Sequence, residues 1–346
     1  MAATRRATRD HGPLSGLDAL RGLAIIAVLL AHFWPVEFPA PPAVTVLIAQ
    51  FGVILFFFLS GFLMDLTYSA EPRVVPYVIR RSFRILPMYW LSILLVVMIE
   101  PGWTLRDVLT NALFVTGPLH VTRMLGVYWT LYIEVLFYAA VPVLFVLGWR
   151  AIMLSPYIVL AAFGTLWLLG MRGAVAPHYL VYCCLGLQFG AWRRKLIDGR
   201  SLLISVAVVV IVVTALPWIA PFPDIVSPFL SAAPLLCAGL LYLALRVPFR
   251  MRLLGVFGEI SYSLYLLHLI VFAVATPWLL PFGYANWLVS VIVIGLCVAA
   301  SIVTLSIVER PMIALGKRII ALWRAMVFRE AAVNAETVTP PSVESG

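Results

Sequence analysis

The chain has 346 residues, of which 63% are hydrophobic and only 11% are charged. Soluble domains carry roughly 25% charged residues, so this composition excludes an ordinary soluble protein and predicts an integral membrane protein. It also excludes an outer-membrane barrel, because barrel strands alternate apolar and polar residues and this chain has long apolar runs. The formal net charge of +9 could indicate a nucleic-acid partner, but excess Lys and Arg in a membrane protein usually mark cytoplasmic loops.

Apolar runs recur along the chain at the length that a membrane helix needs, about 17–25 residues. They lie near residues 17–35, 45–68, 86–100, 127–147, 152–171, 176–192, 202–220, 226–245, 257–276 and 286–308, and the third of them is short. The sequence therefore predicts an all-α, polytopic membrane protein with about ten transmembrane helices.

The distribution of basic residues predicts the orientation of these spans. An even number of spans places both termini on one side of the membrane, and most Lys and Arg residues then fall in segments on that side. Only Arg106, Arg123 and Arg172 fall in segments on the other side. Because cytoplasmic loops carry the excess of Lys and Arg, the N and C termini are predicted to be cytoplasmic, and the positive charge needs no nucleic acid.

The spans define one membrane domain with short flanking segments. Residues 1–16 are predicted to be a cytoplasmic N-terminal segment, and residues 17–310 to be the transmembrane domain. Residues 311–330 alternate apolar and basic residues at helical spacing, which predicts a cytoplasmic amphipathic helix on the anionic leaflet. Residues 331–346 are predicted to be a disordered tail, and the external segment 101–120 to hold a re-entrant or interfacial helix.

The cysteines lie inside apolar runs, at positions 183, 184, 237 and 297. Their spacing matches neither a zinc site nor a disulfide framework, so we interpret them as packing residues. No cluster of metal ligands stands out in the sequence, and no metal is predicted.

The first span carries three ionisable residues, Asp18, Arg21 and His32. On an α-helix, Arg21 and His32 are separated by about three turns plus 20° and by a rise of roughly 16 Å. They share a face without touching, Asp18 can pair with Arg21, and all three are expected to face one groove. Asp18 and Arg21 could equally form an interfacial pair at the helix mouth. His32 lies beyond an apolar run, where an ionisable residue is by default a functional hypothesis.

A second group of charges is the arginine cluster Arg80, Arg81 and Arg84, whose members are spaced as neighbours on a helix. The cluster comes just before Pro87, which is predicted to open the third span at the cytoplasmic face. It would form a compact anion site, because guanidinium forks suit phosphate oxygens. Such arginines can also be topology signals or lipid-headgroup contacts.

Glu134 lies roughly 10 Å inside the external end of the fourth span, between Trp129 and Tyr138. That depth is comparable to the depth of His32. A buried carboxylate beside a histidine would hold one imidazole tautomer and stabilise the imidazolium that forms when the ring takes a proton. Alternatively, Glu134 pairs with Arg21 or bonds a backbone group structurally.

Tyr262, Tyr265 and His268 are spaced to form a polar stripe along one side of the ninth span. Interhelical hydrogen bonds are the plainer role for such a stripe. Glu309 and Arg310 are expected to cap the cytoplasmic end of the last span.

Six segments, in the same order, resemble the membrane-bound acyltransferase family 3, whose members are ten-helix enzymes that acylate glycans, lipids and macrolides. The segments read LDALRGLAIIAVLLAH at 17–32, FFFLSGFLM at 56–64, RRSFRILPMYW at 80–90, YWTLYIEVLFY at 128–138, GEISYSLYLLH at 258–268 and VERP at 308–311. In that family an arginine and a histidine separated by ten residues define the first helix, and Arg21 and His32 fit this spacing. The chief departure is Thr130, where a serine is expected after the tryptophan.

The resemblance, together with the residue patterns, assigns expected roles to the site residues. It implies an acyl-coenzyme A donor, expected to be acetyl-coenzyme A, and no metal. Catalytic roles are expected for His32, Glu134 and Arg21. Donor binding is expected for Arg80, Arg81, Arg84, Asp18 and Tyr89. Binding of the acceptor substrate is expected for Trp129, Tyr138, Tyr265 and His268.

We therefore expect an O-acyltransferase of the plasma (inner) membrane that moves an acyl group, expected to be acetyl, from cytoplasmic acyl-coenzyme A to a hydroxyl of a saccharide or glycan intermediate. His32 would deprotonate that hydroxyl or carry the acyl group itself. An alternative is a transporter that exports a saccharide or lipid-linked precursor and uses the buried charges as a proton relay. Many transporters are built from inverted repeats with broken helices, and the sequence shows no such repeat. A further alternative keeps the enzyme class but changes the acyl group to succinyl or a longer chain, or the acceptor to a lipid or small natural product.

Overall fold

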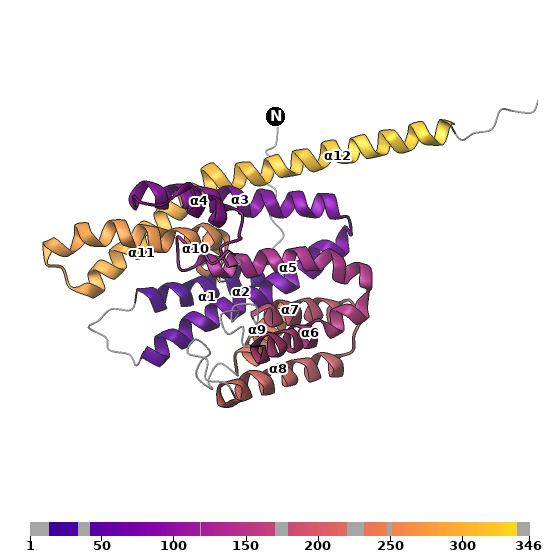
Figure 1. The fold of residues 1–346 in the computed structure, drawn as a ribbon, viewed down its shortest axis with the longest axis horizontal. Helices are drawn as coiled ribbons and strands as arrows, with labels where there is room; N and C mark the ends of the chain where they lie inside the picture. Colours follow the sequence, from indigo (N-terminus) through magenta and orange to yellow (C-terminus); the bar gives the residue numbers. More distant parts are fainter. Residues whose placement is uncertain are drawn as a thin grey trace, which may run out of the picture.

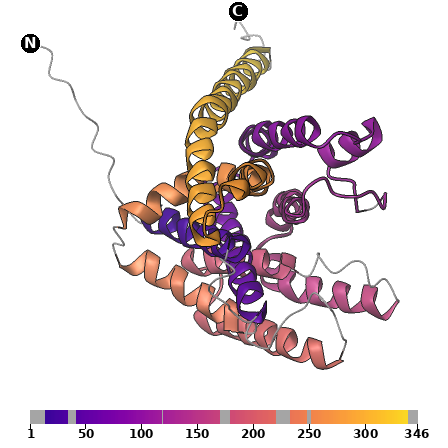
Figure 2. The same cartoon turned by 90° about the vertical axis from the view of Figure 1, so that its left-hand side faces the viewer.

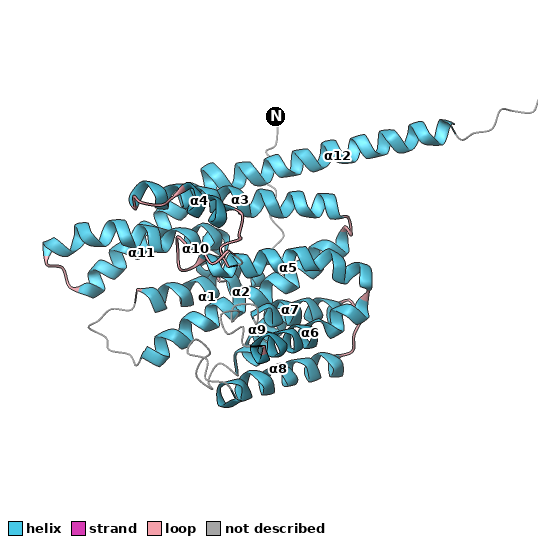
Figure 3. Cartoon of the chain, in the orientation of Figure 1, coloured by secondary structure: helices cyan, strands magenta, loops and turns pink. Residues whose placement is uncertain are grey.

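The computed structural model describes residues 14–33, 42–117, 119–169, 179–219, 232–247 and 251–337. In these residues every regular element is a helix, as Figure 3 shows. The elements are α1 (Leu14–His32), α2 (Pro42–Ala70), α3 (Val74–Ile99), α4 (Leu105–Ala112), α5 (Tyr128–Leu147), α6 (Trp149–Leu168), α7 (Leu180–Arg193), α8 (Gly199–Ile219), α9 (Ala233–Arg246), α10 (Arg252–Leu279), η3 (Leu280–Phe282), α11 (Asn286–Thr304), the π-helical turn η4 (Leu305–Glu309) and α12 (Arg310–Thr337). The all-α prediction is confirmed.

Each predicted span corresponds to one helix, from α1 to α3 and from α5 to α11. By length and composition, 6 helical stretches of the described residues could cross a membrane, and the apolar stretches Gly199–Ala215 and Ala233–Arg246 are shorter. The helices are thus those of a multi-pass membrane protein. The number of about ten spans and the cytoplasmic side of the termini stay predictions.

The long helices lie side by side in one bundle (Figure 1). The connections from α2 to α3 and from α5 to α6 lie at one end, on the right in Figure 1, and the turn between α10 and α11 lies at the other end. Figure 2 views the bundle from that other end. Arg73, before α3, and Arg150, at the start of α6, belong to the right-hand end. We name it the basic end, and it is the end predicted to be cytoplasmic.

Glycines allow α1 and α10 to pack with their backbones in contact. A Cβ atom at Gly22 would lie 2.0 Å from the carbonyl oxygen of Leu254, and one at Gly258 would lie 1.9 Å from the carbonyl oxygen of Asp18. Neither position has room for a side chain, so these small residues set the distance between the helices, as they do in many membrane bundles. This crossing determines which residues of α1 and α10 face each other.

A second crossing of the same kind joins α2 to α7. A Cβ atom at Gly61 would lie 1.9 Å from the Cys183 carbonyl oxygen, and one at Gly186 would lie 1.9 Å from the carbonyl oxygen of Phe58. The two helices therefore touch through their backbones, and α2 is held between α1 and α7.

We expect Gly186→Ala to destabilise the folded protein strongly and Gly164→Ala to leave it intact. The new methyl group at position 186 would press on a backbone oxygen that has no rotamer to change, and overpacking costs ~1–3 kcal/mol or more. Gly164, in α6, has no atom within 4 Å of the corresponding Cβ position, and alanine forms helices better than glycine by about 1 kcal/mol. The melting temperatures of the purified variants in detergent test this. Equal melting temperatures would show that α2 and α7 do not meet at Gly186.

The buried apolar side chains form two clusters that share α1. One cluster contains residues of α2 and of the five helices from α5 to α9, and it includes Leu17 and Leu20 of α1. The other joins α3, α10, α11 and the start of α5, and includes Val28 and Leu29 of α1. The two halves of α1 thus belong to different parts of the core, and the space between the clusters is where a cavity lies.

The third span begins earlier than the sequence predicts. α3 starts at Val74, and Pro87 lies inside it. The predicted start was wrong because it placed the arginines before the span, whereas long arginine side chains can run along apolar surface to polar surroundings. Proline is tolerated inside membrane helices that pack against neighbours. Arg80, Arg81 and Arg84 therefore lie on one continuous helix.

The external segment contains the short helix α4. The Thr104 hydroxyl accepts from the Asp107 backbone N–H, and the Asp107 carboxylate accepts from the Thr104 backbone N–H. This capping box satisfies amide groups that have no partner within the helix. The interfacial or re-entrant position of α4 stays a prediction.

α12 continues α11 through η4 and packs against α3. The Phe83 side chain lies against Gly316, and Arg324 donates to the Glu71 carboxylate at 2.6 Å. In Figure 1, α12 runs beside α3 and extends beyond it. It ends at Thr337, inside the segment predicted to be disordered, and the rest of that segment lies outside the described residues. The placement of α12 on the anionic leaflet stays a prediction.

We expect acid to loosen α12 from α3. Glu71 accepts from both Arg324 and Arg80, each at 2.6 Å. Burial alone would raise the pKa of the Glu71 carboxyl, but these hydrogen bonds hold it below its ordinary value of 4.5. A carboxyl with a lowered pKa stabilises the folded form above its unfolded pKa, and this contribution is lost as the pH falls through the folded pKa.

Spin labels at the exposed positions Val75 and Ala321 would measure this change. Their separation should be constant from neutral pH to about pH 5 and should increase below about pH 4. Glu71→Gln should show the larger separation already at neutral pH. A separation that stays constant through the acidic range would contradict the prediction.

Candidate active site

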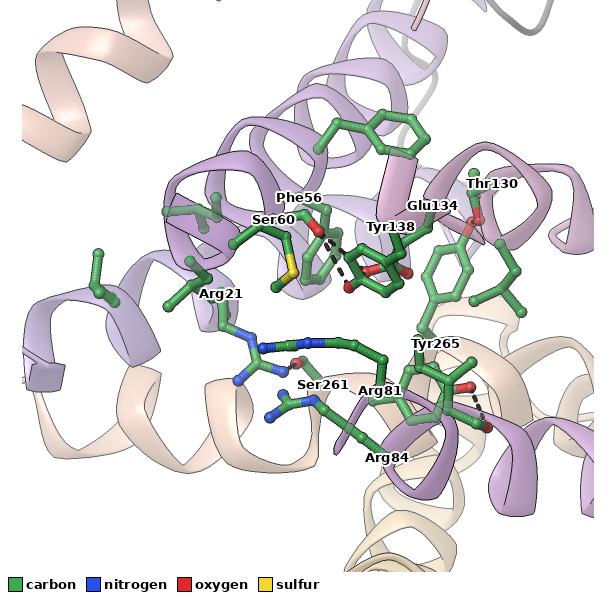
Figure 4. A pocket seen from close by; sticks show the side chains of 18 of the residues that line it. Arg21, Phe56, Ser60, Arg81, Arg84, Thr130, Glu134, Tyr138, Ser261 and Tyr265 are labelled. Carbon is green, nitrogen blue, oxygen red and sulfur yellow. Dashed lines mark hydrogen bonds between the residues drawn. The ribbon is translucent and has the colours of Figure 1, made fainter. Parts of the chain in front are cut away.

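A cavity of about 320 Å³ lies among α1, α2, α3, α5 and α10 (Figure 4). Its volume is at the lower end of the range of about 300–1,000 Å³ that is typical of small-molecule sites. The polar residues that line it are Asp18, Arg21, Ser60, Thr67, Arg81, Arg84, Thr130, Glu134, Tyr138, Ser261, Tyr262 and Tyr265. Its wall also includes Phe57 from one apolar cluster and Leu131 from the other, so the cavity lies where the two clusters meet.

Three guanidinium groups enter the cavity close together, from Arg21 on α1 and from Arg81 and Arg84 on α3 (Figure 4). Arg21 donates to the Ser261 hydroxyl at 3.0 Å and lies 3.7 Å from the Asp18 carboxylate. Arg84 forms no ion pair with another described residue. Neighbouring positive charges repel one another, so this arrangement favours an anionic ligand, and phosphate oxygens match the guanidinium fork.

Arg81 has a buried donor that no group of the described residues accepts. Its guanidinium donates to Thr67 at 3.1 Å and lies 5.5 Å from the centroid of the Tyr138 ring. Its Nε–H group is buried and has no hydrogen-bond partner among the described residues. Because a buried donor without an acceptor costs about 1–3 kcal/mol, this N–H group is a point at which a ligand oxygen would bind.

Arg80 lies outside the cavity, although the sequence groups it with Arg81 and Arg84. Its guanidinium donates to Glu71 at 2.6 Å, on the carboxylate that also binds Arg324. Consecutive residues of a helix point about 100° apart, so Arg80 and Arg81 meet different neighbours. The packing of α12 therefore takes Arg80 out of the predicted anion site.

Glu134 lies in the cavity wall on α5 and is bound by two hydroxyl groups. Ser60 of α2 donates to its Oε1 atom at 3.2 Å, and the Tyr138 hydroxyl donates to the same oxygen. The predicted contact between Glu134 and His32 is not formed in the described residues, and neither is the alternative ion pair with Arg21. Glu134 and His32 were expected to meet because they lie at similar depths in their helices. Depth alone does not determine which helices face each other, and the helix that reaches Glu134 is α2.

Thr130 and Tyr265 close the cavity on the side opposite Arg21 (Figure 4). Their hydroxyl oxygens are 2.8 Å apart, and Phe56 packs on the Tyr265 ring with 6.2 Å between the ring centroids. The threonine that stands where a serine is expected thus keeps the hydroxyl group that this contact requires.

His32 lies at the far end of α1 and does not line the cavity. Its ring meets the ring of His268 edge to face, with 4.9 Å between the centroids. The His268 ring in turn lies 5.9 Å from the ring of Tyr265, which lines the cavity. The groove predicted for Asp18, Arg21 and His32 is therefore divided, because the first two residues line the cavity and His32 lies beyond Tyr265.

Tyr89 and Trp129 also lie outside the cavity. Tyr89 donates to the Asn111 carbonyl oxygen at 2.8 Å and stacks on Phe114, which fastens α3 to the α4 segment. The Trp129 ring packs against the ring of Tyr179, with 4.8 Å between the centroids. The structure does not bring either residue to the donor or acceptor position predicted for it, because residues that are adjacent in a motif point in different directions on a helix.

Glu309 does not cap the last span as the sequence predicts. It is 5% exposed and accepts a hydrogen bond from the Ser263 hydroxyl, whereas Arg310 turns outward and pairs with Glu259 at 2.6 Å. The π-helical turn η4 rotates Glu309 into the bundle, and such turns are frequent at functional sites.

Ser60 and Ser261 bind two of the charged residues of the cavity, and neither has an assigned role in the sequence analysis. The available signal for Ser60 is that it is the single hydroxyl residue in FFFLSGFLM. Ser261 lies one residue before the predicted polar stripe of the ninth span, of which Tyr262 and Tyr265 also line the cavity.

Comparison with known proteins identifies the family. The family model Acyl_transf_3, described as an acyltransferase domain, matches residues 14–306. Nodulation protein 10 of Rhizobium leguminosarum bv. viciae is 30% identical over 131 residues, which cover 36% of this chain and 32% of that protein. The match thus spans about a third of that relative, and no solved structure matches the chain. Because the family model covers most of the chain, the chain belongs to this acyltransferase family, and its helices are those of a multi-pass membrane protein.

Proposed function

We propose that the protein transfers an acyl group, acetyl in the first instance, from cytoplasmic acyl-coenzyme A to a hydroxyl of a saccharide or glycan intermediate at the inner membrane. The observation that carries the proposal is the group of Arg21, Arg81 and Arg84 in one cavity. A coenzyme A donor supplies the phosphates that such a group binds. The donors available to it are the Nε–H of Arg81, which has no partner among the described residues, and the guanidinium of Arg84, which forms no ion pair among them.

The length of α1 suits a long, narrow donor. Arg21 and His32 are separated by a helical rise of roughly 16 Å. With its phosphates bound at Arg21, the donor would place its thioester at His32 only if Tyr265, which closes the cavity on that side, moves aside for the pantetheine arm. The cavity of about 320 Å³ suits this arm better than the whole donor. The adenosine part would therefore stay at the basic end.

His32 is the proposed base. Its Nδ1 atom is 2.8 Å from the Val28 carbonyl oxygen, and because a carbonyl only accepts, Nδ1 carries the hydrogen and Nε2 the lone pair. Nε2 would take the proton of the acceptor hydroxyl while the hydroxyl oxygen attacks the thioester carbon. When the C–S bond breaks, the thiolate takes that proton from His32, which releases the ester and the coenzyme A thiol and restores the base.

The test is mass spectrometry of cell-surface glycans and small glycosides from cells with and without this chain. The proposal expects an acyl mass that is present only with the chain, and release of coenzyme A when membranes containing the chain receive acetyl-coenzyme A. Unchanged glycans with altered saccharide export and no thioester consumption would favour the transporter. An acyl mass other than acetyl would keep the enzyme class and change the donor.

A further inference from the structure

His268 is a buried histidine that the proposed reaction does not yet use. Its Nδ1 atom is 2.8 Å from the Tyr265 carbonyl oxygen, which only accepts, so Nδ1 carries the hydrogen. Nε2 therefore carries the lone pair, and it is buried without a hydrogen-bond partner among the described residues. An unsatisfied buried acceptor costs free energy, so an apolar ring of the same shape would fill this space more favourably if His268 served only to pack.

The surroundings of His268 leave His32 as the neighbour whose charge changes in the reaction. In the described residues the rings that contact His268 belong to His32, Phe33 and Tyr265. From α11 the thiol of Cys297 donates to the His268 carbonyl oxygen at 3.8 Å. No Asp, Glu, Lys or Arg side chain of the described residues forms an ion pair with either histidine.

We propose that His268 is a positioning residue that stabilises the imidazolium form of His32 during acyl transfer, an inference that rests on the proposed function. The imidazole of His268 has its positive end at the Nδ1–H group, which is fixed on the Tyr265 carbonyl, and its negative end at Nε2. A fixed dipole stabilises a positive charge near its negative end, because it does not have to reorganise when that charge forms. The centroids of the two rings are 4.9 Å apart, so the proton taken up by His32 places its charge beside this dipole.

The crossing of α1 on α10 builds this pair together with the donor site. The close contacts at Gly22 and Gly258 hold the two helices in register. In that register Arg21 reaches Ser261, and about three turns further along α1, His32 reaches the ring of His268. His268 thereby supplies the stabilisation that the sequence analysis assigned to Glu134.

Three substitutions separate this electrostatic role from packing. His268→Gln places an amide oxygen near the position of Nε2, so an acceptor is kept. His268→Asn is shorter and places its amide near the position of Nδ1, so the acceptor at Nε2 is lost. His268→Phe keeps a ring and loses both nitrogens. The assay is transfer of radiolabelled acetyl from acetyl-coenzyme A into membrane material as a function of pH, with protein levels matched by immunoblot and melting temperatures measured in detergent.

We expect His268→Gln to keep most of the wild-type rate and the wild-type pH profile. His268→Asn and His268→Phe should lose roughly tenfold in rate, and the acid limb of the profile should move about one unit to lower pH, because one interaction with a charge is worth about that much. The direction follows because an imidazolium that has lost its stabilising dipole forms only at a lower pH. A packing role predicts the opposite order, with phenylalanine above glutamine, since it leaves no polar group buried.

A rate for His268→Phe at or above that of His268→Gln, or an acid limb that does not move in any variant, would overturn the inference. Should His268→Phe fail to fold, the comparison of glutamine with asparagine decides. A folded wild-type protein that transfers no acetyl removes the proposed function and the inference together. An active wild-type protein with the reversed order of variants removes the inference alone.

Discussion

His32→Ala is expected to abolish acyl transfer while the protein still inserts and folds. General bases contribute about 10²–10⁴-fold to a rate, so transfer of labelled acetyl should fall by at least roughly 100-fold. Insertion should be unaffected because loss of the imidazole makes α1 more apolar. The His32 side chain is exposed, so its removal leaves no cavity in the core of the bundle.

Leu30→Ala is the matched control for this variant. Leu30 is 43% exposed and lies half a turn before His32 on α1, so its truncation has the same effect on size without removing the base. It should retain the wild-type rate in membranes with protein levels matched by immunoblot. Near-normal turnover by His32→Ala would remove His32 from the mechanism and leave family membership without a base at this position.

Arg84→Ala should weaken coenzyme A binding by roughly 10- to 100-fold, because a hydrogen bond to a charged group is worth about 1.5–3 kcal/mol. Stability should change little, since Arg84 forms no ion pair among the described residues. Arg84→Lys should recover only part of the affinity, because an ammonium group offers a point charge in place of a fork. Titration calorimetry with coenzyme A in detergent measures both variants.

Arg80→Ala distinguishes the sequence cluster from the cavity. A compact site of three arginines would lose similar affinity at each position, whereas the contact of Arg80 with Glu71 predicts a much smaller loss there than at Arg84. Arg193→Ala serves as the control, because Arg193 is exposed at the end of α7 and does not line the cavity. Wild-type affinity in the Arg84→Ala protein would exclude the cavity as the donor site.

The sequence by itself determines the helices and the family. An apolar run in lipid has to satisfy its backbone groups internally, so each run of sufficient length has one available structure, and every predicted span contains a helix among its described residues. The same runs carry the motifs that resemble the family, and the family model matches residues 14–306. The bounds of α3 could not be predicted in this way, because Arg80, Arg81 and Arg84 are polar at their tips and apolar along their stems.

Tertiary structure alone decides how the motif residues divide among partners. Arg80 and Arg81 are adjacent in the chain, yet α12 binds one and the cavity holds the other. Arg21 and His32 share a face of α1, yet Arg21 lines the cavity and His32 does not. Tyr265 of α10 lines the cavity on one side and contacts His268, the neighbour of His32, on the other.

The meeting of His32 with His268 has the same origin. Helical periodicity determines the direction in which each side chain leaves its own helix. Which residues of two helices come into contact depends on how closely, and at which positions, the two backbones approach each other. Here Gly22 and Gly258 set that approach. Glu134 consequently binds Ser60 of α2, and the place beside His32 falls to a histidine of α10.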